Sequence, residues 1–288
     1  MTEVVNGPLW HGRNWAAHAG EGSIHDDETA ADLGFRGGTV PGDVHMNQFP
    51  ATLVKVFGDA WWETGHLSLN FKNATVDREP VQVFVEPADE KLARVWMARD
   101  DGLLVCEGTA GLDSLDDAHL HTIDTRPCDS SELRILREVY PGLVLGDYEM
   151  RTDPGKQFAR YDQDLLSDPL RCFREPHPRY AAVLACPATF IQFMWGPPME
   201  GLRPYTADAV GLFGAIEIAQ RSGPFVLDQT YRFVSTVLSV GQSPKTEYLW
   251  YETVASQNGR DIASMRMQLR FMKASSDLYR STTEPTNE

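Results

Sequence analysis

Apolar and polar residues alternate along two long stretches of the chain, which is the pattern of half-buried antiparallel strands. The first stretch contains four such runs, at 67–71, 81–85, 95–97 and 103–107. Asp100-Asp101-Gly102 separates the last two runs, and glycine tolerates the positive φ angle that a hairpin turn requires. The first stretch therefore predicts an antiparallel sheet.

The second stretch repeats this plan. Its alternating runs lie at 216–218, 231–233, 248–250 and 265–271. Asn258-Gly259 precedes the last run, and Asn-Gly favours a tight hairpin. Gly102 and Gly259 lie roughly 150 positions apart, and so do Pro41 and Pro187, which indicates an internal duplication.

A segment with helical spacing precedes each predicted sheet. The first runs roughly from Asp43 to Trp62 after Pro41-Gly42, and its apolar positions follow the helical period at Met46, Phe49, Leu53, Val54 and Phe57. We expect Val44 to Phe57 to be buried. The second segment runs from Ala188 to Trp195 after Cys186-Pro187. A helix followed by antiparallel strands predicts the α+β class, with the helix covering one sheet face.

The duplication predicts four parts of the chain. We expect a first repeat at 1–112, a linker at 113–135, a second repeat at 136–275 and a disordered tail at 276–288. The linker is acidic, with Asp113, Asp116, Asp117 and Asp124, and we expect it to be solvated.

Composition limits the possible partners. The net charge of −15 argues against nucleic acid, because phosphate binding needs an excess of Lys and Arg. A few local cations can still hold the phosphates of coenzyme A, and Arg36, Lys156 and Arg160 are candidates. No run of about 18 apolar residues predicts a membrane span. Residues 1–6 lack the basic and apolar regions of a secretory signal.

The cysteines give no sign of a metal or redox site. Cys106, Cys128, Cys172 and Cys186 include no CxxC pair, so we expect reduced thiols in a cytoplasmic protein. His119 and His121 have a spacing that can bind metal, but solvated loop residues are the favoured interpretation. We therefore expect no metal and no cofactor.

The most informative segment runs from Ser23 to Gly42. Ile24-His25 is followed by Asp27 and Ala31, then by Gly34-Phe35, and Gly42 opens the predicted helix. This arrangement resembles the signature of the MaoC-like hydratases and dehydratases. The motif is local, and the sheet pattern extends a looser resemblance over residues 10–112.

The resemblance implies a hot-dog fold, in which an antiparallel sheet wraps around a helix. With the duplication, the whole chain is expected to be a tandem double hot-dog. The second half carries a weaker echo around His177, and Ala185-Cys186-Pro187-Ala188-Thr189-Phe190 is similar to a motif of related dehydratases. It lacks the acidic and turn residues after its histidine, so we expect a degenerate repeat.

The resemblance also implies a chemistry. In the family, a His and an Asp hold a water that is added to, or removed from, the Cα–Cβ bond of an acyl thioester. His25 is then the catalytic histidine. The thioester carbonyl is expected at the start of the helix, where Gly42 donates its N–H and Asp43 lies beside the substrate. His45 either lines this pocket or serves the core or the surface.

One family residue is missing. The family aspartate lies five positions before the histidine, where this chain has Gly20, and the family asparagine is replaced by Gly22. Glu21 lies one position away and can supply the carboxylate if the loop is shifted. The alternative is that the acid–base pair has been lost.

Other polar and aromatic residues have simpler interpretations. Asp26 and Asp27 are expected to cap a short helix at 27–33. Asp208 and Glu217 are similar to helix acids of hot-dog thioesterases, but Glu217 lies in an alternating run and is expected to be exposed. Trp61-Trp62 and Trp250-Tyr251 are expected to pack.

The sequence thus predicts an enoyl-thioester hydratase or 3-hydroxyacyl-thioester dehydratase, a lyase acting on coenzyme A or acyl-carrier-protein substrates. A thioesterase, decarboxylase or cyclase on the same scaffold, or a non-catalytic acyl-binding subunit, are the alternatives. Because one chain would already contain two hot-dog units, we expect a monomer or a homodimer.

Overall fold

The computed structural model describes residues 3–17, 22–123, 125, 128–163, 165–167, 170–206 and 208–280. The strands of the first half are β1 (Val5–Asn6), β2 (Trp10–His11), β3 (Gly65–Phe71), β4 (Pro80–Pro87), β5 (Leu92–Arg99) and β6 (Leu104–Leu112). Its helices are α1 (Asp27–Asp32), α2 (Gly42–Met46), α3 (Pro50–Phe57), the 3-10 turn η1 (Gly58–Ala60) and α4 (Trp61–Thr64).

The second half contains β7 (Val144–Arg151), β8 (Gly211–Gln220), β9 (Thr230–Gln242), β10 (Thr246–Gln257) and β11 (Arg260–Met272). Its helices are α5 (Pro154–Tyr161), α6 (Pro187–Thr206) and α7 (Asp277–Arg280), with 3-10 turns η2 (His119–His121), η3 (Ser130–Glu132), η4 (Arg171–Phe173) and η5 (Lys273–Ser275). In the described part of the chain, no helix is both long enough and apolar enough to cross a bilayer.

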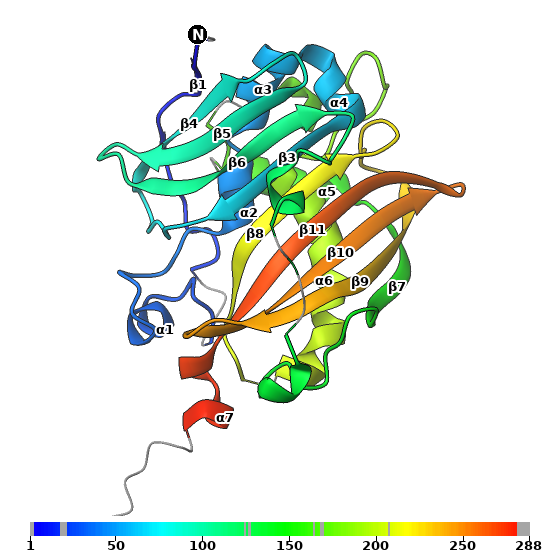
Figure 1. The fold of residues 1–288 in the computed structure, drawn as a ribbon. Helices are drawn as coiled ribbons and strands as arrows, with labels where there is room; N and C mark the ends of the chain where they lie inside the picture. The colour runs from blue at the N-terminus through cyan, green and yellow to red at the C-terminus, as the bar shows by residue number, and fades with distance from the viewer. Residues whose placement is uncertain are drawn as a thin grey trace, which may run out of the picture.

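The strands form one continuous antiparallel sheet. The order along its main path is β1-β4-β5-β6-β3-β8-β11-β10-β9-β7, and β2 pairs with β4. β3 and β8 join the two halves, and Ser68 lies opposite Glu217 at the centre of their pairing. The sheet therefore runs without interruption from one repeat into the other (Figure 1).

Helices cover one face of this sheet. Leu67 and Leu69 of β3 and Ile216 of β8 are buried in the same core as Phe49 beside α3 and Phe190 of α6. In Figure 1, α2, α3 and α6 lie behind the sheet, and α6 follows the strands of the second half. The α+β class predicted from the sequence is confirmed, with a helix and an antiparallel sheet in each half.

The first predicted helix is broken into pieces. The chain forms α2, α3, η1 and α4 instead of one helix from Asp43 to Trp62. Pro50 has no N–H group and is the first residue of α3, and Gly58 ends that helix with φ of 62°. The second helix extends beyond its predicted end at Trp195 and contains Pro197 and Pro198. β7 was not predicted.

The predicted linker and tail are more ordered than expected. Leu120 is fully buried and packs against Ala215 and Trp250 on the sheet face opposite the helices. Asp113, Asp116 and Asp117 are exposed, as expected for a solvated linker, while its apolar residues attach it to the sheet, and η2 lies in front of the sheet in Figure 1. Asp277–Arg280 forms α7 and not a disordered tail, while 281–288 lie outside the described residues.

Candidate functional site

A cavity of about 470 Å³ lies where the two repeats meet. The segment from Gly22 to His45 and the end of β3 supply one side, and α6 and the start of β8 supply the other. Its apolar walls are formed by Ile24, Phe35, Val40, Phe71, Ile191, Trp195, Met199, Leu212, Phe213 and Leu269. Its polar lining includes His25, Asp43, His45 and Gln192. Cavities of this size and composition are typical of small-molecule sites.

Local hydrogen bonds bring the signature segment to this wall. Asp26 caps α1 by accepting from the N–H of Thr29 at 2.9 Å, as predicted. Asp27 Oδ1 accepts from the N–H of Gly38 at 2.7 Å and so closes the loop after α1. The N–H of Thr39 donates to the carbonyl of Ile24 at 2.9 Å, which places His25 beside Thr39.

The ring of His25 has a defined tautomer. Its Nδ1 lies 2.7 Å from the carbonyl oxygen of Thr39, and a carbonyl can only accept, so Nδ1 carries the hydrogen. The neutral ring then has a lone pair at Nε2, which has no hydrogen-bond partner among the described residues. Burial lowers the pKa of His25, although the Thr39 carbonyl and the charge of Asp43 act in the opposite direction. His25 is thus suited to accept a proton at neutral pH.

Among the described residues, Asp43 is the carboxylate that lines the same cavity as His25. It is 4% exposed, and its Oδ1 accepts from the N–H of Val44 at 2.9 Å. Gln192 Nε2 donates to Oδ2 at 3.4 Å, and an Arg160 guanidinium nitrogen lies 3.7 Å from the same oxygen. Burial raises the pKa of Asp43, while Arg160, the Val44 N–H and His25 lower it.

The remaining predicted residues of the helix start also line the cavity. His45 is 2% exposed, its Nε2 lies 2.8 Å from the hydroxyl of Thr75, and burial lowers its pKa to about 4. It is therefore neutral near pH 7. A Cβ at Gly42 would lie 2.9 Å from the ring of Phe71, so this glycine is needed for close packing. His25, Gly42, Asp43 and His45 are thus brought together, as expected.

Several candidates lie elsewhere. Glu21 is outside the described residues. His177 contacts Tyr180 and Asp59 and not the cavity. Arg36 pairs with Glu79, while Lys156 lies over the ring of Phe193.

The exposed role predicted for Glu217 is wrong. Glu217 is 2% exposed, because the linker covers it and His121 Nε2 lies 2.9 Å from its carboxylate. Asp208, the other acid considered with it, accepts from the hydroxyl of Ser276 and the N–H of Asp277. Neither acid lines the cavity.

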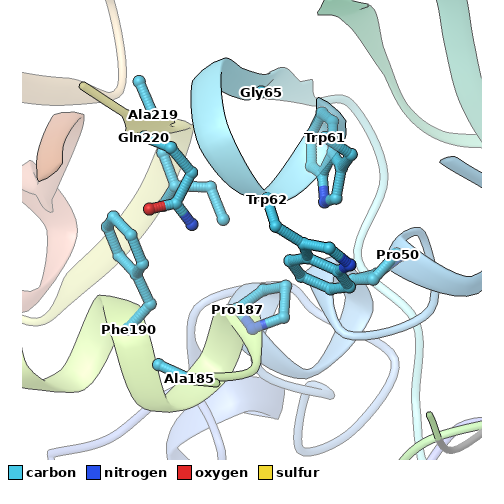
Figure 2. Close-up of a pocket in the computed structure, with 10 residues that line it drawn as sticks. Pro50, Trp61, Trp62, Gly65, Ala185, Pro187, Phe190, Ala219 and Gln220 are labelled. Atoms are coloured by element: carbon cyan, nitrogen blue, oxygen red, sulfur yellow. The ribbon is translucent and has the colours of Figure 1, made fainter. Parts of the chain in front are cut away.

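The corresponding place in the second repeat is filled. Only about 10 Å³ remains between Trp61, Trp62 and the start of α6. Figure 2 shows Trp62 beside Pro50 and Pro187, with Phe190 across the space. The two repeats are related through the β3–β8 pair. Trp61 and Trp62, which precede β3, therefore take the position in their repeat that Gly211 and Leu212, at the start of β8, take beside the large cavity. The two tryptophans therefore pack, as predicted, and they close the second place.

Sequence reasoning missed the contribution of the second repeat to the site. The sequence indicates Arg160 only as a possible phosphate contact and gives no sign of Gln192. Both lie more than a hundred positions from Asp43 in the chain, so no local motif links them. Trp15, whose ring lies 4.0 Å from the Arg160 guanidinium, was also missed.

Comparisons with known proteins identify the fold. No protein-family model matches the sequence, and a search of the curated proteins finds no match. Among solved structures, a protein described as a MaoC domain dehydratase from Chloroflexus aurantiacus J-10-fl is similar, with a TM-score of 0.56 and 9% identity over 94% of this chain and 95% of that one. A MaoC-like dehydratase has a TM-score of 0.52 and 14% identity over 94% and 98% of the two chains.

A conserved hypothetical protein from Mycobacterium tuberculosis, described as having a double hot-dog fold, has a TM-score of 0.57. Its identity is 12%, over 94% of this chain and 96% of that one. Likenesses at these identities define an architecture and leave the chemistry to the site. The chain therefore has the double hot-dog fold, which it shares with proteins described as MaoC-like dehydratases.

Proposed function

We propose that this protein is an acyl-thioester hydratase or dehydratase. The observation that carries the proposal is His25, a half-buried imidazole that lines the cavity, whose Nδ1 donates to Thr39 and whose Nε2 has no hydrogen-bond partner among the described residues. Its sequence surroundings resemble the hydratase signature, and the fold is that of MaoC-like dehydratases.

The proposed reaction adds water across the Cα–Cβ double bond of an enoyl thioester, or reverses that addition. In hydration, an acid–base group removes a proton from the bound water as its oxygen bonds to Cβ. The electron pair of the double bond moves onto the thioester as an enolate, and Cα then takes up a proton. His25 holds and polarises the water, and a carboxylate completes the pair.

The thioester is proposed to lie with its carbonyl near Gly42, the first residue of α2, and with Asp43 and His45 beside it. A backbone donor at this position stabilises the enolate oxygen. The apolar side of the cavity, which includes Phe213 and Leu269, accommodates the acyl chain. No cofactor or metal is required by this scheme.

The carrier is proposed to be coenzyme A or an acyl carrier protein. A second hollow of about 250 Å³ adjoins the cavity and shares Phe35, Lys72 and Asn73 with it. Arg36 also lines this hollow, so two cations, Arg36 and Lys72, line it, which suits a phosphate-bearing arm. Their present partners are Glu79 and Glu107.

The test is hydration of crotonyl-coenzyme A by the purified chain, followed through loss of the enoyl absorbance. His25→Ala is expected to lower kcat by about 10²–10⁴-fold, the range for loss of an acid–base group. His177→Ala is the matched control, since this histidine lies outside the cavity. Robust turnover that His25→Ala leaves unchanged would rule out the assignment. Binding of acyl-coenzyme A without turnover would favour a non-catalytic acyl-binding subunit.

A further inference from the structure

We infer that Asp43 is the carboxylate that acts with His25, and that Arg160 and Gln192 of the second repeat position it. The inference rests on the proposed function, because it assigns the second member of the acid–base pair. It also assigns to the second repeat a part in the site of the first.

The geometry separates the two oxygens of Asp43. Oδ1 is held by the N–H of Val44 at 2.9 Å, which fixes the carboxylate at the start of α2. Among the described residues, the contacts of Oδ2 are longer, at 3.4 Å from Gln192 Nε2 and 3.7 Å from an Arg160 guanidinium nitrogen. An oxygen with long contacts keeps capacity to accept from a bound water, and Asp43 lines the same cavity as His25.

Arg160 is largely buried beside Asp43 and can act on it as a charge. Its guanidinium lies 4.0 Å from the ring of Trp15, and its side chain is 12% exposed. The titratable groups that face Asp43 are His25, Arg160 and Cys186. Burial raises the pKa of Asp43, and Arg160 is the largest influence that lowers it. Without this cation, the buried carboxyl would be protonated at a higher pH.

The contact between the repeats is built to keep this arrangement. Asn47 Oδ1 accepts from the N–H of Ala188 at 2.8 Å, next to the first residue of α6. Gln48 donates to the carbonyl of Leu165 at 2.9 Å and accepts from the N–H of Ser167 at 2.6 Å. These bonds join the end of α2 to the second repeat, and they therefore help to hold Arg160 and Gln192 next to Asp43.

The proton balance closes within the pair. A water held by His25 Nε2 gives one proton to Asp43 while its oxygen bonds to Cβ. The protonated Asp43 then gives that proton to Cα of the enolate, which restores the carboxylate. Dehydration follows the same steps in reverse.

The first experiment compares three variants on crotonyl-coenzyme A. Asp43→Asn is expected to lower kcat by about 100-fold or more. Arg160→Gln is expected to move the acidic limb of the kcat/KM profile to higher pH by about one unit. The reason is that an opposite charge within about 4–6 Å lowers the pKa of a carboxyl by at least that much. Arg160→Lys keeps the charge and should restore most of the profile. Lys156→Gln removes a cation from the same helix, α5, and serves as the matched control.

The second experiment does not need turnover. Titration of the His25 imidazole by NMR should give a lower pKa in Asp43→Asn than in the parent, because the carboxylate charge is lost. An unchanged His25 pKa would overturn the inference, as would mild loss in Asp43→Asn alongside severe loss in Glu21→Gln. If the parent turns over no enoyl thioester, the proposed function fails, and the titration alone decides whether the two groups act as a pair.

Discussion

The buried imidazoles make the stability of the protein depend on pH. His45 has its pKa lowered to about 4 by burial, while a histidine in the unfolded chain titrates near 6.5. As the pH falls below 6.5, the unfolded chain therefore binds a proton that the folded chain does not. Stability is retained above pH 6.5 and lost as the pH falls toward 4, by about 2 kcal/mol between pH 7 and pH 5 for this residue alone.

His45→Gln is expected to reduce this difference between pH 7 and pH 5 by about 2 kcal/mol, whatever its effect at neutral pH. Chemical denaturation at the two pH values measures it. His11 is exposed, so His11→Gln should leave the difference as it is in the parent. If the parent loses no more stability than His45→Gln between pH 7 and pH 5, His45 is not buried in its neutral form.

The sequence predicted the residues of one side of the site and not those of the other. His25, Gly42, Asp43 and His45 follow one another within a short segment, so a motif could identify them together. Arg160 meets Asp43 only because the second repeat packs against α2 through α6, which is a property of the fold. The role proposed for Glu21 stays a prediction, because that residue is outside the described part of the chain.

At the scale of elements, α4 closes the second place against the sheet. Trp62 is 4% exposed and lies against the start of α6. Trp62→Ala is expected to lower the free energy of unfolding by about 3–5 kcal/mol, because the space it leaves can collapse only partly. Trp15 is 37% exposed, so Trp15→Ala should cost much less in the same denaturation experiment. Equal losses would show that Trp62 is not a core residue.

The linker is attached to the sheet by a buried polar contact. His121 Nε2 lies 2.9 Å from Glu217 Oε1, and the other carboxylate oxygen is buried with no hydrogen-bond partner among the described residues. His121→Ala should destabilise the protein by about 1–3 kcal/mol, because it leaves the buried carboxylate unpaired.

Glu217→Gln provides the comparison for this contact. If His121→Ala costs less when Glu217→Gln is already present, the double-mutant cycle attributes the loss to the pair. Additive effects of the two changes would show that the linker is held by its apolar contacts instead.

Element types could be predicted because each has a period of its own, but breaks and edges could not. The Asn258-Gly259 turn is confirmed, with positive φ at both residues. The apolar spacing of the first helical segment continues past Pro50 and so gives no sign of the break at that residue. β7 lies at the sheet edge, and only its second half alternates, with Tyr148 and Met150 between charged residues, a run too short to predict a strand by itself.

At the scale of the molecule, the two repeats complete one another. Residues 1–112 alone would expose the edge of β3 that pairs with β8, and they would lack α6 over the cavity. We expect this fragment to aggregate or self-associate, since an open strand edge recruits another. Circular dichroism and size-exclusion chromatography of the fragment measure this. A stable, folded monomer would contradict the single-sheet description.

The intact chain is expected to be a monomer or a homodimer. Sedimentation should give a mass of 32.2 kDa or twice that value. The reason is that β3 and β8 already provide within one chain the strand pairing that separate hot-dog subunits would need. A larger ring as the stable species would count against this expectation.

The closed place beside Trp62 has an evolutionary meaning. When two identical subunits assemble, any change of sequence appears in both copies of a site, so a residue that blocks one blocks the other. Covalent fusion removes that coupling and lets each half drift independently. Here one half carries Trp62 where the other carries Gly211, and the half whose place is filled supplies Arg160 beside Asp43 of the other half.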